Sequence, residues 1–238
     1  MRLLVTRPEP DAAETAIRLR ALGHEVIVDP LLTIAFAEPP AGIATPAAIL
    51  LTSRNALRAL LRWPGVAAWL GRPVFAVGPE TGALARASGF TDVRIALGNA
   101  AALTDLVVAE FDPAAGTILY PAARDRAAEI DTVLGKRGIR VLRVEAYRAA
   151  AAERFSPAAE AALRAHALDG LLVFSRRTAA AFRDAAERAG LAADLAGLVF
   201  YALSGEAGEP LRGIAGATVK VAARTDSDAL FALLPPGG

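Results

Sequence analysis

Short apolar runs alternate along the chain with Ala-rich segments of helical character. The runs are rich in Val, Leu and Ile, which favours β-strands. Strands that alternate with helices in this way predict parallel sheets covered by helices, a doubly wound α/β fold. The predicted strands are Leu3–Thr6, Glu25–Val28, Ala48–Leu51, Val74–Val77, Val93–Ala96, Thr117–Tyr120, Arg140–Val144, Leu171–Phe174, Val199–Leu203 and Thr218–Ala222.

Residues typical of helix ends separate several of these runs. Asp11 and Glu14 have the spacing of a capping box, which predicts that a helix begins here, and Gly23 predicts its end. Ser156 followed by Pro157 predicts another helix start, because Ser is a good N-cap and Pro is tolerated at the first helical position. These residues at predicted helix ends therefore agree with alternating strands and helices.

The chain also contains an internal repeat. It places Ser53 opposite Ser175 and Gly78 opposite Ser204. The similar segments follow one another in the order a–b–a′–b′, which indicates duplication of one α/β unit and predicts two similar parallel-sheet domains. The repeat is far too long for a solenoid. The matching segments are 2–35 with 117–149, 50–61 with 172–183, and 75–85 with 201–211.

Two Pro-containing stretches, 37–46 and 149–157, interrupt the pattern, and each follows an a unit. We interpret both as linkers, because Pro and small residues are typical of such segments. Domain 1 is then expected to be discontinuous, with residues 1–36 plus 150–238, and domain 2 to comprise 37–149. Two linkers would keep the domains together and still permit hinging, with a ligand cleft between them.

Composition narrows the classes of function. Lys and Arg total 26 against 25 Asp and Glu, so the formal net charge is +1 and we expect no nucleic-acid partner. The chain has no Cys, which excludes thiolate catalysis and Cys-ligated metals, and His24 lies far from His166, so we expect no metal site. The alternative is a hard cation held by carboxylates alone. The glycine-rich fingerprints of nucleotide-binding loops are missing, so we expect no cofactor.

The sequence gives no sign of a membrane or export segment. Arg7, Glu9 and Asp11 interrupt the N-terminal region before an apolar stretch can form, and runs such as Gly170–Phe174 are far too short to cross a bilayer. With 54% hydrophobic and 21% charged residues, the chain has ample material for a buried core. We therefore expect a cytoplasmic protein without a membrane partner.

The candidate chemistry lies in turns that follow predicted strands and open helices. Ligands of open α/β sheets bind at the carboxyl ends of strands, and helix N-termini there suit anions. We therefore predict a site for carboxylates or phosphates, with Arg7, Arg54 and Arg176 as contacts at its rim and Pro121 with Arg124 in a further such turn. Each Ser or Thr taken alone has a second interpretation as an ordinary N-cap. The other predicted binding residues are Thr6, Thr52, Ser53, Gly78, Thr81, Ser175, Ser204 and Gly205.

Taken in order, these turns resemble those of the uroporphyrinogen-III synthase family. The resemblance covers residues 2–234, and the ordered set is more specific than any one motif. It implies a cofactor-independent lyase of tetrapyrrole (haem) biosynthesis. Such enzymes close hydroxymethylbilane, a linear tetrapyrrole with eight carboxylates, to uroporphyrinogen III, with inversion of the last pyrrole ring and loss of water. The motifs are TRP (6–8), LTSRNA (51–56), AVGPET (76–81), ILYPAARD (118–125), VEAYRA (144–149), FSRRTA (174–179), ALSGEAG (202–208) and TDSDAL (225–230).

The resemblance also implies roles for single residues. Tyr147 matches the acid proposed for the family, and an unperturbed phenol, with a pKa near 10, is protonated at neutral pH and can donate to a departing hydroxyl. The other interpretation of Tyr147 is an aromatic that packs at a strand end. Where the family often has Thr, this chain has Ala207, so that hydroxyl is missing or Ser204 replaces it.

We expect a monomer that makes at most a transient contact with the preceding enzyme of the pathway. Two other functions fit a two-domain α/β fold. One is a non-catalytic sensor of small anions within a regulator. Such regulators usually carry an output domain, for which 238 residues leave no room. The other is a nucleotide-sugar enzyme, against which the missing glycine fingerprint argues.

Overall fold

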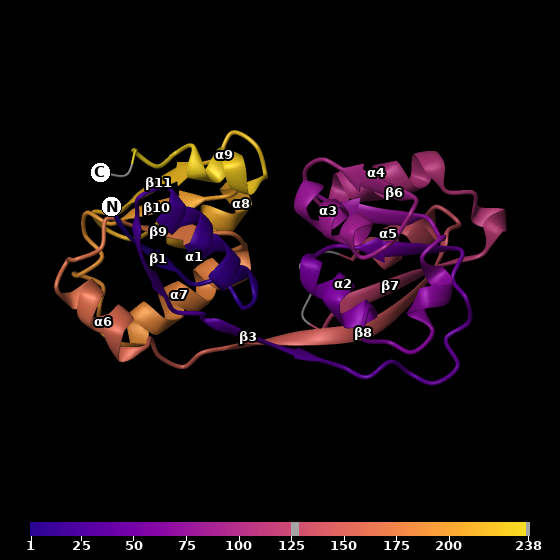
Figure 1. The fold of residues 1–238 in the computed structure, drawn as a ribbon, viewed down its shortest axis with the longest axis horizontal. Coiled ribbons are helices and arrows are strands. Elements are labelled where there is room, and N and C mark those ends of the chain that lie inside the picture. The colour runs from indigo at the N-terminus through magenta and orange to yellow at the C-terminus, as the bar shows by residue number, and fades with distance from the viewer. Residues whose placement is uncertain (125–128, 237–238) are drawn as a thin grey trace. The chain divides into compact units, whose positions relative to one another are not determined.

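Two compact units, each with its own largely parallel sheet, make up the chain (Figure 1). The computed structural model describes residues 1–124 and 129–236. Unit 1 comprises Met1–Thr33 with Ala150–Gly238, and unit 2 comprises Ile34–Ala149. The expected α/β class with parallel sheets is confirmed. The predicted domains and these units differ in the placement of residues 34–36, and the division into functional domains stays a prediction.

Unit 1 is a five-stranded parallel sheet with helices on both faces (Figure 1). In sheet order its strands are β11 (Thr218–Val221), β10 (Val199–Ala202), β9 (Gly170–Val173), β1 (Arg2–Val5) and β2 (Glu25–Val28). Its helices are α1 (Asp11–Ala21), α6 (Pro157–Arg164), α7 (Arg176–Arg188), α8 (Gly205–Gly208) and α9 (Ser227–Phe231), with the 3₁₀ turn η3 (Glu209–Leu211). Leu3 and Val5 pack with α1 and α9, whereas Leu4 packs with α6, α7 and α8. Because successive side chains of a strand face opposite sides, each strand contributes to the hydrophobic cores on both faces of the sheet.

Unit 2 repeats this arrangement around a six-stranded sheet. In sheet order its strands are β3 (Leu32–Phe36), β8 (Arg140–Ala151), β7 (Thr117–Ala123), β4 (Ala48–Leu51), β5 (Val74–Val77) and β6 (Val93–Ala96). Its helices are α2 (Arg54–Leu60), α3 (Pro79–Ala87), α4 (Ala100–Glu110) and α5 (Ile130–Lys136), with the 3₁₀ turns η1 (Val66–Trp69) and η2 (Pro113–Ala115). Ile49 and Leu51 pack with α2 and α3, whereas Leu50 packs with α4 and α5.

Strand β3 is the strand that the sequence pattern does not predict. It is an edge strand whose sheet neighbour is β8. The backbone N–H of Ala37 donates to the carbonyl of Ala146 at 2.8 Å, and that of Ala152 donates to Leu31 at 3.0 Å, so the two segments run antiparallel. The chain passes between the units in this pair, after Thr33 and after 149. The Pro-containing stretch 37–46 lies inside unit 2.

Pro121 lies within β7 and not, as predicted, in a turn after it. Proline cannot donate a hydrogen bond to a neighbouring strand, so it is unusual in the middle of a sheet. Here β7 pairs with β4 only at Ile118 and Leu119, and beyond that point its partner is β8 alone. Pro121 therefore occupies a position that is locally at an edge. In the part of the chain that the structure describes, no helix is long and apolar enough to span a bilayer.

Candidate active site

In each sheet the chain order reverses between two neighbouring strands. In unit 1 this point lies between β1 and β9, because β1 leads to α1 on one face and β9 leads to α7 on the other. In unit 2 it lies between β4 and β7, which lead to α2 and α5 on opposite faces. Ligands of open α/β sheets bind at the carboxyl ends of strands at such points. The predicted residues there are Thr6, Arg7, Ser175 and Arg176 in unit 1, and Thr52, Ser53 and Arg54 in unit 2.

Three of the predicted serines are helix N-caps with extended backbone. Each hydroxyl oxygen accepts a backbone N–H three residues on: Ser53 from Ala56 at 3.0 Å, Ser175 from Thr178 at 3.2 Å and Ser204 from Ala207 at 3.1 Å. One acceptor position of each hydroxyl is thus already used. The second partners differ. Ser175 Oγ lies 2.9 Å from Thr178 Oγ1 in its own helix, whereas Ser53 Oγ lies 2.9 Å from the hydroxyl of Tyr147.

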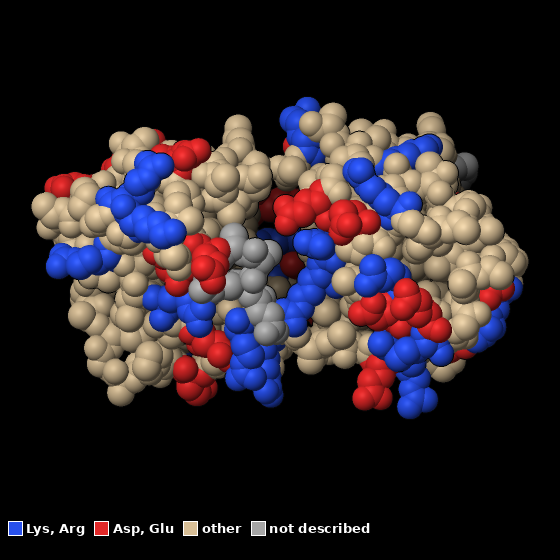
Figure 2. Space-filling view, turned by 180° about the vertical axis from the view of Figure 1, so that it is seen from behind, with Lys and Arg blue, Asp and Glu red and all other residues tan. Residues whose placement is uncertain are grey.

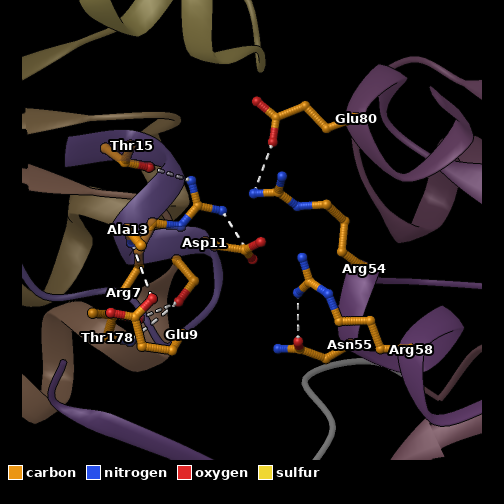
Figure 3. A network of polar contacts seen from close by, with 11 residues as sticks. Arg7, Glu9, Asp11, Ala13, Thr15, Arg54, Asn55, Arg58, Glu80 and Thr178 are labelled. Carbon is orange, nitrogen blue, oxygen red and sulfur yellow. Dashed lines mark hydrogen bonds and ion pairs between the residues drawn. The ribbon is translucent and has the colours of Figure 1, made fainter. Parts of the chain in front are cut away.

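Arg7 is buried, unlike the rim residue that the sequence predicts. Its side chain is 10% exposed. The guanidinium donates to Thr15 Oγ1 at 3.2 Å and pairs with the carboxylate of Asp11 at 3.4 Å (Figure 3). It also lies 3.8 Å from the ring centroid of Phe174. Burying a guanidinium is unfavourable unless it is paired and hydrogen-bonded, and these contacts supply both. Arg7 therefore links the turn after β1 to α1.

The predicted capping box at the start of α1 is wrong. The N-cap is Pro10 and has no side-chain cap bond, and the Asp11 side chain faces Arg7. The backbone N–H of Ala13 donates instead to Glu9 Oε2 at 3.0 Å (Figure 3). The sequence predicted a capping box because Asp11 and Glu14 have the right spacing. An acidic residue at position 11 also fits an i,i+4 ion pair with Arg7, and the structure shows that pair.

Arg54 and Arg176 differ in exposure. The Arg54 side chain is 13% exposed and its guanidinium lies 3.2 Å from the carboxylate of Glu80, whereas Arg176 is 62% exposed and pairs with Glu209 at 3.4 Å. Next to Arg54 on α2, Arg58 donates to Asn55 (Figure 3). Sequence reasoning missed Glu80 as a partner, although it directly follows Gly78 and Pro79 in the AVGPET motif. Arg54 thus holds a carboxylate of its own chain in this structure.

The turn before α3 offers backbone groups more than side chains. Gly78 is the N-cap with φ of +75°, and no side chain caps this helix. Glycine adopts this left-handed region at little cost, and a Cβ added here would meet nothing within 4 Å. Thr81 is buried in the first turn, as Thr6 is after β1. The first turn of α3 therefore presents backbone N–H groups and a positive dipole end.

The turn after β10 leads to Ala207, the position where the resemblance implies a Thr in many relatives. Ala207 is 3% exposed and packs into the core beneath α7, so its side chain does not face the end of the sheet. Ser204 caps α8, and Gly205 is the first residue of that helix. The hydroxyl available in this turn is that of Ser204.

Tyr147 owes its direction to an irregularity in β8. Ala122 pairs with Glu145 and Ala123 pairs with Tyr147, so Ala146 is an extra residue on β8. In a regular strand neighbouring side chains face opposite sides, but here Ala146 and Tyr147 both pack in the cluster beneath α2 and α3. The Tyr147 ring is buried, and its hydroxyl meets Ser53 Oγ at 2.9 Å. The bulge therefore brings the phenol to the N-terminus of α2.

The closing TDSDAL motif forms a helix cap as well. Asp226 Oδ1 accepts the backbone N–H of Ala229 at 2.7 Å, and Arg224 Nε donates to its other oxygen at 3.0 Å. The bond from Ala229, followed by that from Arg224, holds the pKa of Asp226 below its usual value. This motif fixes α9 on the sheet of unit 1.

On the face shown in Figure 2, basic and acidic side chains lie interspersed on each unit, with no continuous surface of one sign. Within residues 1–124 and 129–236, no group of three or more His, Asp or Glu side chains is arranged to hold a metal ion. The features that stand out in each unit are the turns at the carboxyl ends of the strands.

Comparison with known proteins identifies the family and the fold of the chain. The family model of uroporphyrinogen-III synthase HemD matches residues 13–232. The fold is similar to that of uroporphyrinogen-III synthetase from Helicobacter pylori, with a TM-score of 0.63 and 16% identity over 98% of each chain. It is also similar to a mutant uroporphyrinogen III synthase from Thermus thermophilus, with a TM-score of 0.57 and 16% identity over 98% of this chain and 97% of that one. A search of curated proteins gives no match. The chain belongs to the uroporphyrinogen-III synthase family and is a cyclising lyase of tetrapyrrole biosynthesis.

Proposed function

We propose that the small-molecule substrate of this synthase is hydroxymethylbilane and that Tyr147 is its general acid. The phenol donates its proton to the departing hydroxyl, the C–O bond breaks with its electron pair on oxygen, and water leaves. The last pyrrole ring then attacks the carbon that carried the hydroxyl and forms a spirocyclic intermediate. This intermediate reopens, and the macrocycle closes with the last ring inverted. The final closure releases one proton, so the overall change is loss of one water, and the phenol can be reprotonated.

The observation that carries this proposal is the placement of Tyr147. The bulge in β8 turns a phenol towards the carboxyl end of the sheet, where it meets Ser53 at the start of α2. A residue with only a packing role does not need the irregular register that brings this hydroxyl to the N-terminus of α2. General acid catalysis of this kind contributes on the order of 10²–10⁴-fold to a rate.

We propose that the substrate carboxylates bind to the turns at the carboxyl ends of the strands. Arg54 and Arg176 supply charge, and the first turns of α3 and α7 supply backbone N–H groups. Arg7 has a different role in this proposal: its buried pair with Asp11 fixes the turn that carries Thr6. Restraint of a long, flexible substrate by many such contacts would lower the barrier by orientation.

We further propose that the enzyme acts as a cytoplasmic monomer. We also propose that it needs neither metal nor cofactor, because the chain lacks Cys, has only two His and carries no glycine-rich nucleotide fingerprint. No comparison supports the alternative of a small-anion sensor. The experiment supplies enzymatically generated hydroxymethylbilane and separates the isomers formed, with and without EDTA. Isomer III in excess of the spontaneous isomer I supports the substrate and reaction. A sensor would leave isomer I as the product, and a loss of activity that only a divalent ion restores would refute metal independence.

A further inference from the structure

We infer that Ser53 is a positioning residue for Tyr147: its hydroxyl donates to the phenol oxygen and so directs the phenolic proton away from Ser53 and towards the substrate. The two oxygens lie 2.9 Å apart, and either could be the donor by distance alone. The inference rests on the proposed role of Tyr147 as the acid. It changes the role of Ser53 from a contact of the substrate to a contact of the acid.

The direction of the bond follows from the hydrogen-bonding capacity of Ser53. A serine hydroxyl has one donor and two acceptor positions. One acceptor position is used by the backbone N–H of Ala56, at 3.0 Å, because Ser53 caps α2. The single O–H donor of Ser53 is then left for another acceptor, and among the described residues the phenol oxygen of Tyr147 lies within hydrogen-bond distance of it, at 2.9 Å. Donation from a backbone N–H also polarises the hydroxyl and makes it a better donor.

The serine cap of α7 is arranged differently. Ser175 has the same extended backbone and cap bond, but its Oγ contacts Thr178 Oγ1 within the same helix. The contact of Ser53, in contrast, joins residues 94 positions apart in the sequence. It depends on the bulge that places Tyr147 on the α2 side of the sheet. One hydrogen bond thus joins the residue that the bulge positions, Tyr147, to the residue that caps α2, Ser53.

The chemical effect concerns the ionised phenol. When the phenol gives its proton to the departing hydroxyl, negative charge develops on the phenol oxygen. A hydrogen bond donated to that oxygen strengthens as the charge grows, and so it lowers the barrier more than it stabilises the bound substrate. Loss of Ser53 is therefore expected to lower kcat while KM stays nearly constant.

The test is Ser53→Gly, because glycine at an N-cap costs only a few tenths of a kcal/mol relative to serine. We expect kcat to fall by about tenfold, KM to change less than twofold, and the alkaline limb of the pH–rate profile to move to higher pH. Ser53→Thr retains both the cap and the hydroxyl and should restore kcat. Ser156→Ala is the matched control: Ser156 caps α6 through Ala159 at 3.3 Å and is not part of the candidate site, so this variant should keep kcat.

A double-mutant cycle with Tyr147→Phe separates the possible outcomes. If Ser53 acts through Tyr147, the Ser53→Gly change adds no further loss in the Phe background. An equal loss in both backgrounds, or a rise in KM with kcat unchanged, would overturn the inference and return Ser53 to substrate binding. If Tyr147→Phe itself keeps full kcat, the proposed acid is wrong and the inference fails with it. If Tyr147→Phe is impaired but Ser53→Gly is not, only the inference fails.

Discussion

Replacement of Glu80 by Gln is expected to strengthen substrate binding. In the structure the Glu80 carboxylate lies 3.2 Å from the Arg54 guanidinium, so we expect an incoming substrate carboxylate to compete with it for Arg54. The two side chains are 32% and 13% exposed, so the pair is neither fully solvated nor deeply buried. Exposed pairs contribute about 0.2–1 kcal/mol, and we take the upper end, about 1 kcal/mol, for this partly buried one. Release of that competition corresponds to roughly fivefold tighter binding.

The assay is KM for enzymatically generated hydroxymethylbilane at several ionic strengths. Glu80→Gln should lower KM by about two- to fivefold at low salt and by less at high salt, because salt screens partly exposed charges. Arg54→Ala should raise KM. The control is Glu110→Gln, which removes a partner of Arg94 at 3.3 Å outside the candidate site and should leave KM unchanged. An unchanged or higher KM in Glu80→Gln would refute the competition between Glu80 and the substrate for Arg54.

Two further predictions concern stability. Phe182 is fully buried between two other phenylalanine rings, with centroids 5.4 and 5.7 Å away, so Phe182→Ala should cost about 3–5 kcal/mol in urea unfolding, and a cost below 1 kcal/mol would contradict this packing. Burial, and secondarily the N-terminal charge, lowers the pKa of His24 below 6.5. Between that lowered value and about 6.5 the unfolded chain binds a proton that the folded chain does not, so stability is full above about pH 6.5 and declines as the pH falls. His24→Leu should flatten the dependence of Tm on pH between 7 and 5, and an equally steep dependence would show that other groups cause it.

The sequence pattern predicted most of the strands. Runs such as Val74–Val77 are apolar on both sides, as expected for strands buried between two layers of helices, and their limits agree with the structure. Strand β3 escaped prediction because an edge strand of this kind is stabilised by its pairing with β8, more than 100 positions away in the chain, and not by its own pattern. Pro121 misled the interpretation for a similar reason, since it is tolerated only where β4 has ended.

The candidate site was predictable as a set of turns but not as a set of contacts. Ser53 and Arg54 could be placed at a strand end because the residue types and the preceding apolar run are local signals. The burial of Arg7 depends on Phe174, which directly follows β9, a strand far away in the sequence. The contact between Ser53 and Tyr147 depends on a register shift opposite Ala122 and Ala123 that no local pattern encodes.

The most direct test of the central claim is the rate and product of the Tyr147→Phe variant with hydroxymethylbilane. The substitution removes the phenolic hydroxyl and keeps the buried ring, so folding and substrate contacts should be preserved. We predict a kcat lower by about 10²–10⁴-fold, a KM within twofold of the parent, and spontaneous isomer I as the main product. A variant that forms isomer III at the parental kcat would contradict the assignment of Tyr147 as the general acid.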